Sequence, residues 1–226
     1  MSVAERMDRL QQGTLSDRVY RDLRELLMAG QVAPGEKLNP RAIAGALGTS
    51  AMPVREALRR LMAEQAVEFL PNTAIRVPVM TAARFREVRA IRITLEGMAT
   101  EAASGSITPA ELAAARRHAQ AFLDAPDDAP EAIIRANKDL HFAVYRAAGM
   151  PVLLQMIEAL WTQVGPVLNL DIRSGSERIR GRVARRHHAG MLDALAQGDG
   201  VAARAALVDD IMDAGDFILG QGRLPP

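Results

Sequence analysis

The feature that most constrains the fold of this chain is the ungapped block of residues 51–61, which directly follows a Gly-containing turn. Ser50 is a typical helix N-cap residue, and Pro53 falls in the first turn of the next helix, where a missing N–H is tolerated. Four apolar residues at helical spacing predict one buried face: Val54, Ala57, Leu58 and Leu61. Three arginines lie off this face and are expected to point outward: Arg55, Arg59 and Arg60. Such a helix suits the major groove of DNA, although an ordinary amphipathic helix with solvated arginines has the same pattern.

The flanking segments favour the DNA-binding interpretation. Apolar residues from Leu15 to Leu27 predict a first amphipathic helix, and a second short helix is expected over 40–47. Two runs with alternating apolar residues, 67–70 and 75–79, follow the third helix and predict a hairpin. Three helices and a hairpin within about 80 residues make a winged helix-turn-helix.

The order of residues in this half resembles the GntR family of bacterial transcription regulators. Three segments carry the resemblance, and the last is the most specific: Pro34–Leu38, Leu47–Ser50 and Pro53–Leu61. The resemblance implies a double-stranded DNA operator as partner. The residues expected at that operator are Arg41, Ser50, Ala51, Met52 and Arg55, together with Arg59 from the outer face of the same helix.

Two positions depart from the family pattern. Ala51 stands where the family usually has Arg, and Ala74 stands where it usually has a Gly in the wing. The missing arginine predicts weaker or altered DNA binding, because arginine can bond guanine or phosphate. Ala tolerates positive φ poorly, so the turn of the wing is also expected to change.

A chain of 226 residues is long enough for two domains. We predict a mobile N-terminus over residues 1–13, a winged helix-turn-helix over 14–80 and a helical effector-binding domain over 81–222. No apolar run approaches the ~18 residues of a membrane span, and no signal peptide is visible, so we expect a cytoplasmic protein without a membrane partner. The absence of Cys excludes disulfides and thiolate metal sites.

The predicted fold class is mainly α, because the sequence after Thr81 predicts helices to its end. Residues 108–111 (Thr-Pro-Ala-Glu) form a capping box, and Gly165-Pro166 is expected to kink or divide its helix. Six helices are expected to form an all-α bundle. They cover roughly 81–104, 109–124, 130–148, 151–170, 175–197 and 200–220.

This helical half resembles the FCD ligand-binding domain of the FadR branch of the same family. The resemblance rests on Arg89–Glu96, Asn137–Phe142, His188–Asp199 and Ala205–Ile211. It implies a bundle of about six helices around a polar cavity. In many members a carboxylate and three histidines hold a divalent metal there.

Carried over residue by residue, the resemblance implies a metal site at Asn137, His141, His188 and Asp210. Asn137 and Asp210 depart from the commoner Asp and His, which leaves Asp210 as the single anionic ligand. Nitrogen and oxygen donors without thiolate suit Zn, Ni or Mn. The alternative is that His141 and His188 are hydrogen-bonded histidines of the core or of a pocket.

The resemblance also implies that the effector is a small organic acid. Arg89 and Arg92 share one helix face and fit a role in binding its carboxylate, since Arg can make two parallel bonds to a carboxylate. The alternative for Arg92 is an outward ion pair with Glu96. A run of arginines before His188 is expected to be mainly a solvated face, with room for one or two to turn into the cavity: Arg173, Arg178, Arg180, Arg182, Arg185 and Arg186.

These observations predict a ligand-responsive transcription regulator and not an enzyme. We expect a homodimeric repressor that binds a palindromic operator and senses a small organic acid, with a divalent metal as cofactor. One alternative is a helical metalloenzyme with an appended binding domain, since a His/Asp metal site can activate water. Another is a sensor with weakened DNA binding, suggested by Ala51 and Ala74.

Overall fold

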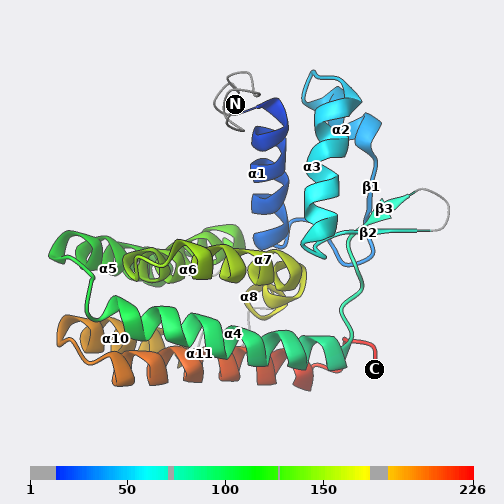
Figure 1. The fold of residues 1–226 in the computed structure, drawn as a ribbon. Coiled ribbons are helices and arrows are strands. Elements are labelled where there is room, and N and C mark those ends of the chain that lie inside the picture. The colour runs from blue at the N-terminus through cyan, green and yellow to red at the C-terminus, as the bar shows by residue number, and fades with distance from the viewer. Residues whose placement is uncertain (1–13, 71–73, 127, 174–182) are drawn as a thin grey trace, which may run out of the picture.

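The N-terminal part of the computed structural model is a winged helix (Figure 1), as predicted. The structure describes residues 14–70, 74–126, 128–173 and 183–226, so the predicted mobile N-terminus lies outside the described residues. The three strands form one antiparallel sheet in the order β1-β3-β2, with Leu38 and Phe69 both opposite Ile75. The elements are α1 (Leu15–Met28), β1 (Lys37–Leu38), α2 (Pro40–Ala46), α3 (Ala51–Ala63), β2 (Glu68–Phe69) and β3 (Ile75–Arg76).

Helix α3 forms because its apolar stripe has a partner. Val54, Ala57, Leu58 and Leu61 are all 0% exposed and pack against apolar residues of α1, as the spacing predicted. Ser50 occupies the N-cap position with extended backbone angles, but its hydroxyl makes no capping hydrogen bond.

Arg60 lies on the exposed side of α3, as predicted, and 44% of its side chain is exposed. It pairs with Asp17 of α1 at 2.6 Å, and its guanidinium carbon lies 3.9 Å from the centre of the Tyr20 ring. Ala74 does not take a positive φ, since Gln65 is the one non-glycine residue in the described part of the chain that does. Instead the Ala74 carbonyl accepts a hydrogen bond from the Leu70 backbone N–H, so the wing needs no glycine at this point.

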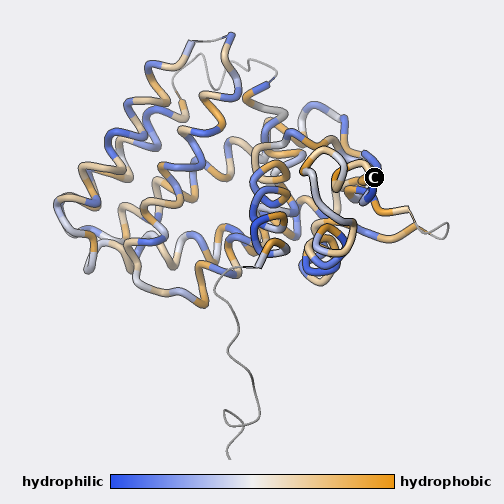
Figure 2. The backbone as a smooth tube through the Cα atoms, turned by 90° about the horizontal axis from the view of Figure 1, so that it is seen from above, coloured by the Kyte–Doolittle hydropathy of each residue, from blue (hydrophilic) through white to orange (hydrophobic). Residues whose placement is uncertain are grey.

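The C-terminal part is a helical bundle. Figure 1 shows α5 and α6 above α4, with α10 and α11 below it. Along these helices hydrophilic and hydrophobic residues alternate (Figure 2), as expected for helices with one buried face. Among the described residues no helix is both long and apolar enough to cross a membrane. The helices are α4 (Ala82–Ala103), α5 (Pro109–Asp124), α6 (Pro130–Ala147), α7 (Pro151–Leu168), α8 (Leu170–Arg173), α10 (Val183–Ala196) and α11 (Gly200–Gly220).

Local signals set several helix ends as predicted. Thr108 and Glu111 form a reciprocal capping box at the start of α5, and the Asp199 carboxylate accepts from the Ala202 N–H at the start of α11. Of the two outcomes expected at Gly165-Pro166, a kink or a division, the division is wrong, because α7 continues to Leu168 with Pro166 inside it.

Gly165 has a different role, which is to let α1 approach α7. A Cβ at this position would lie 2.4 Å from the Leu27 carbonyl oxygen and 2.7 Å from Met28 Cα. One turn later, the Asn169 side-chain amide donates to the Met28 carbonyl at 3.0 Å. The end of α1 is therefore fixed to α7, so the winged helix and the bundle share a tight contact.

Candidate functional site

Three potential metal ligands from three helices meet in the core of the bundle. His141 of α6, His188 of α10 and Asp210 of α11 are only 2%, 2% and 6% exposed. His141 Nε2 lies 3.5 Å from Asp210 Oδ2, and His188 Nε2 lies 3.7 Å from the same oxygen. One donor atom from each residue falls within 4.8 Å of the other two. The sequence placed these residues in one site through the family resemblance alone, and the structure brings them together.

The spacing of these donors fits a divalent ion. Two ligands of a tetrahedral zinc ion lie ~3.3 Å apart, because each is about 2.0–2.1 Å from the metal. The two His–Asp separations of 3.5 and 3.7 Å are close to that value. The fourth predicted ligand, Asn137, is half-buried and lies one turn before His141 on α6.

A second layer of polar groups orients His141. The Tyr145 hydroxyl donates to Glu96 Oε2 at 2.5 Å and lies 3.1 Å from His141 Nδ1. Burial, and then the Glu96 carboxylate, raise the pKa of Tyr145 well above its usual range, so the hydroxyl keeps its hydrogen. Because that hydrogen goes to Glu96, Tyr145 accepts a hydrogen bond from His141 Nδ1–H. With Nδ1 turned to Tyr145, the nitrogen that faces Asp210 is Nε2, which is the ring atom available to a metal.

Neither Glu96 nor Tyr145 was singled out as a site residue from the sequence. Tyr145 follows His141 by four residues, as His141 follows Asn137, so the three lie along one face of α6. This spacing was the available signal. Nothing in the sequence indicated that Glu96 of α4 would meet that face.

The two arginines predicted to bind an effector do not converge. Arg92 is buried and pairs with Glu96, its Nε lying 2.6 Å from Oε1. The predicted alternative of an Arg92–Glu96 pair is therefore present, although it points inward. Arg89 instead runs over Gly215 of α11 to the exposed carboxylate of Asp216, at 2.5 Å. Both guanidinium groups already have a carboxylate partner.

The predicted DNA-contacting residues gather on one side of the winged domain. A hollow of about 520 Å³ opens between α2, α3 and the wing, and three exposed arginines line it: Arg41, Arg55 and Arg59. Within the described residues none of the three forms an ion pair. Met52 is 70% exposed and Ser50 is exposed, whereas Ala51 is partly buried against the core of the domain.

Comparison with known proteins gives two matches along the chain. Residues 15–77 match the gntR family of bacterial regulatory proteins, and residues 87–212 match the FCD domain. The transcriptional regulator McbR of Escherichia coli is 36% identical over 157 residues, which cover 69% of this chain and 71% of McbR. YdhC of Bacillus subtilis, an uncharacterised transcriptional regulator, is 28% identical over 124 residues, or 54% of this chain and 55% of YdhC.

Solved structures agree with these matches. The structure of Escherichia coli McbR/YncC superimposes with a TM-score of 0.84 at 30% identity, over 94% of this chain and all of that one (100%). A GntR-type structure from a Rhodococcus species has a TM-score of 0.71 at 24% identity, over 91% of this chain and 97% of that one, and shows the shared fold. The winged helix, the helical bundle and the matches to both halves lead to one assignment: this chain belongs to the GntR family of bacterial regulatory proteins, as a transcriptional regulator with a C-terminal FCD domain and not an enzyme.

Proposed function

We propose that the protein is a homodimeric cytoplasmic repressor of the FadR branch that leaves a palindromic operator when a small organic acid binds at a divalent ion in the FCD domain. The observation that carries this proposal is the buried cluster of His141, His188 and Asp210. A site of this donor chemistry in the core of a bundle joined to a winged helix suits a sensor. The predicted boundary near residue 80 falls between β3 and α4 and remains part of the proposal.

The DNA-binding part of the proposal rests on unpaired positive charge. Arg55 and Arg59 of α3 and Arg41 of α2 face the hollow beside the wing, and α3 has the docking geometry of a recognition helix. Ser50, Ala51 and Met52 lie at the N-terminal end of the same helix, which is the part that contacts base edges in this motif.

The metal would be held by His141, His188 and Asp210, with Asn137 as a neutral oxygen ligand; Zn, Ni and Mn all suit this set. A bound ion would supply a positively charged position for the carboxylate of an acid. Tyr145 and Glu96 would keep His141 in the tautomer that presents Nε2. Asp210 alone would supply negative charge to the ion, so the loaded site would retain positive charge that favours an anion.

Helix α7 offers a route from this site to the DNA-binding domain. Trp161 of α7 contacts His141, with 5.8 Å between ring centres, and Arg92 stacks over the same indole. Gly165, one turn further along α7, and Asn169, at its C-cap, contact the end of α1. A ligand that moves α7 would therefore shift the populations of two positions of α1 and of the winged domain.

The homodimer has support from an exposed apolar stripe on α4. Ile91 and Met98, two turns apart on one side of the helix, are 40% and 42% exposed. We expect a second copy of the chain to cover this stripe, because a palindromic operator binds two subunits related by a two-fold axis. Light scattering of the full chain should give twice the mass of 24.4 kDa, and a monomer that still binds the operator would contradict this part of the proposal.

The experiment that tests the function as a whole combines metal analysis with DNA binding. The purified chain should carry about one Zn, Ni or Mn ion, by mass spectrometry of its metals. It should shift DNA that flanks its own gene in a gel, and some organic acids should abolish the shift. Metal-free protein that responds to the same acids would disprove the role of the ion, and indifference to every acid would disprove acid sensing.

The alternative of a sensor with weakened DNA binding makes a different prediction for Ala51. This residue packs partly against the core of the winged domain at the start of α3, and the rest of its surface is accessible. If the missing arginine limits affinity, Ala51→Arg should tighten operator binding, mainly at low salt.

A further inference from the structure

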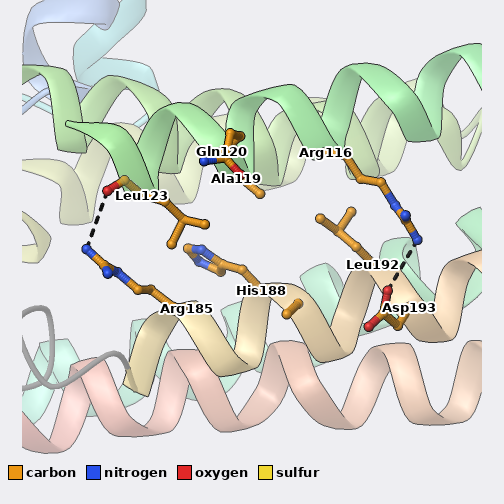
Figure 3. Close-up of a pocket in the computed structure, with 9 residues that line it drawn as sticks. Arg116, Ala119, Gln120, Leu123, Arg185, His188, Leu192 and Asp193 are labelled. Atoms are coloured by element: carbon orange, nitrogen blue, oxygen red, sulfur yellow. Dashed lines mark hydrogen bonds and ion pairs between the residues drawn. The ribbon is translucent and has the colours of Figure 1, made fainter.

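One residue of the buried cluster, His188, lines a pocket between α5 and α10. The pocket has a volume of about 250 Å³, and the His188 side chain forms part of its wall (Figure 3). His188 also lies 3.7 Å from Asp210 in the cluster. The pocket therefore reaches a residue of the proposed metal site. Arg89, which was predicted to bind the effector, extends instead to Asp216 on α11.

The pocket has apolar walls and charged ends. Leu123 of α5 and Leu192 of α10 face the space on either side of His188. Arg185 lies at one end and Arg116 at the other (Figure 3). The volume is below the roughly 300–1,000 Å³ of pockets for drug-sized ligands, so a molecule that fits is small.

Arg116 and Arg185 differ in the hydrogen-bond partners of their N–H groups. Arg116 pairs with Asp193 at 3.2 Å, and both side chains are more than half exposed, at 53% and 66%. This end of the pocket is thus close to neutral. Arg185 makes one long hydrogen bond, from Nη2 to the Leu123 carbonyl at 3.5 Å, and its buried Nε has no hydrogen-bond partner among the described residues.

A guanidinium carries five N–H donors, and a buried donor without an acceptor is costly. An anion in the pocket would supply acceptors to Arg185 in the planar arrangement that a carboxylate offers. Arg89 and Arg92 do not line this pocket, and each already pairs with a carboxylate, that of Asp216 and that of Glu96. Of the two arginines that line the pocket, Arg185 is the one with a buried donor that has no acceptor among the described residues.

We propose that Arg185 is the residue that binds the carboxylate of the effector, and that the effector is a small monocarboxylic acid whose apolar body lies between Leu123 and Leu192. This inference rests on the proposed acid-sensing function. Arg185 and His188 line one pocket, so the charged end of the acid faces both. The far end holds the Arg116–Asp193 pair, so it offers no net positive charge to a second carboxylate, which favours monocarboxylates over dicarboxylates.

The test is isothermal titration of the full, metal-loaded chain with acetate, butyrate and hexanoate, with their amides and with succinate. A monocarboxylate should bind, and its amide and succinate should not. Arg185→Gln should weaken that binding by about 10- to 100-fold, as expected for the loss of hydrogen bonds to a charged group. The matched control is Arg186→Gln, which removes the next arginine along α10, an exposed one outside the pocket lining, and should leave the affinity unchanged.

A second variant tests the pocket without altering its charge. Ala119 of α5 lines the space, so Ala119→Leu should fill part of it and weaken acid binding while the protein still binds Zn²⁺. Acid binding by Arg185→Gln at wild-type strength, with loss in Arg92→Gln instead, would overturn the inference and leave acid sensing intact. Loss of Zn²⁺ binding in Arg185→Gln would also overturn it, because Arg185 would then be needed to maintain the cluster of His141, His188 and Asp210. If the wild-type chain binds none of the acids, both the acid-sensing function and this inference fail.

Discussion

Tyr145 of α6 donates a 2.5 Å hydrogen bond to Glu96 of α4, and the same hydroxyl lies 3.1 Å from His141 Nδ1. One phenol thus connects a buried carboxylate to a proposed metal ligand. The connection sets which nitrogen of His141 carries the proton, and it makes the second layer of the site open to experiment.

Tyr145→Phe should lower metal affinity by about 10- to 100-fold, the usual cost of removing a partner of a metal-bound histidine. The chain has two tyrosines, and Tyr20 also donates to a glutamate, the α3 C-cap residue Glu64, at 2.6 Å. Tyr20→Phe is therefore a matched control that should leave metal affinity unchanged. Trp161, the single tryptophan, lies beside His141, so quenching of its fluorescence by Ni²⁺ can report binding. Equal quenching curves for the two variants would contradict the proposed role of Tyr145.

Removal of the ion should destabilise the folded protein. An ion at 100 times its dissociation constant adds about 2.7 kcal/mol to the free energy of unfolding when it binds the folded state alone. Chelation should lower the melting temperature of the wild type and leave His141→Ala and His188→Ala unchanged. Asn137→Ala should keep part of the effect, because it removes a neutral oxygen ligand.

His187→Ala is the control for this series. His187 precedes His188 on α10 and faces a neighbouring side of that helix, where it pairs with Asp213 of α11 at 2.8 Å. It should respond to chelation like the wild type. A melting temperature of the wild type that is indifferent both to chelators and to added Zn²⁺, Ni²⁺ or Mn²⁺ would remove the metal site and leave buried, hydrogen-bonded histidines.

Glu96→Leu should destabilise the bundle by about 3–5 kcal/mol, because it leaves the buried Arg92 guanidinium without its carboxylate. The double variant Arg92→Leu/Glu96→Leu should recover most of that loss, since it removes both buried charges. Urea unfolding of the wild type, the single variant and the double variant measures these differences. A double variant no more stable than the single one would show that the Glu96 bond to Tyr145 outweighs the ion pair.

Arg55→Ala should weaken specific operator binding by about 1–3 kcal/mol if Arg55 bonds a base. Arg60→Ala is the control on the same helix, because Arg60 is tied to Asp17 and Tyr20. Fluorescence anisotropy with operator and with scrambled DNA distinguishes the two roles. If Arg55→Ala weakens both DNAs alike and lowers the salt dependence, Arg55 contacts phosphate.

The parts of the fold that sequence predicted best depend on neighbours along the chain. The apolar stripe of α3 and the Thr108–Glu111 capping box are set within one or two helical turns, so spacing and residue type are enough to find them. Gly165-Pro166 was misjudged because the same dipeptide that ends helices elsewhere here provides room for the backbone of α1. That requirement comes from a helix over 130 residues away in the sequence.

The candidate site shows the same division. His141, His188 and Asp210 were found through family resemblance, since no local pattern joins three helices. Glu96 was missed as a member of the site because Tyr145 lies on α6, although its pairing with Arg92 one turn away on α4 was anticipated. Arg185 stood among similar arginines, and only the packing of α10 against α5 separates it from Arg186.

The absence of a side chain at Gly165 also bears on how such regulators can be recombined. The covalent link between the two halves lies near residue 80, but α1, which belongs to the DNA-binding half, rests on α7 of the other half. A chimera cut at that link and joined to a bundle with any larger residue at this position would place a methyl group 2.4 Å from the Leu27 carbonyl. Exchange of DNA-binding specificity between relatives is therefore expected to succeed when the acceptor bundle keeps a glycine there, and to give poorly folded hybrids when it does not.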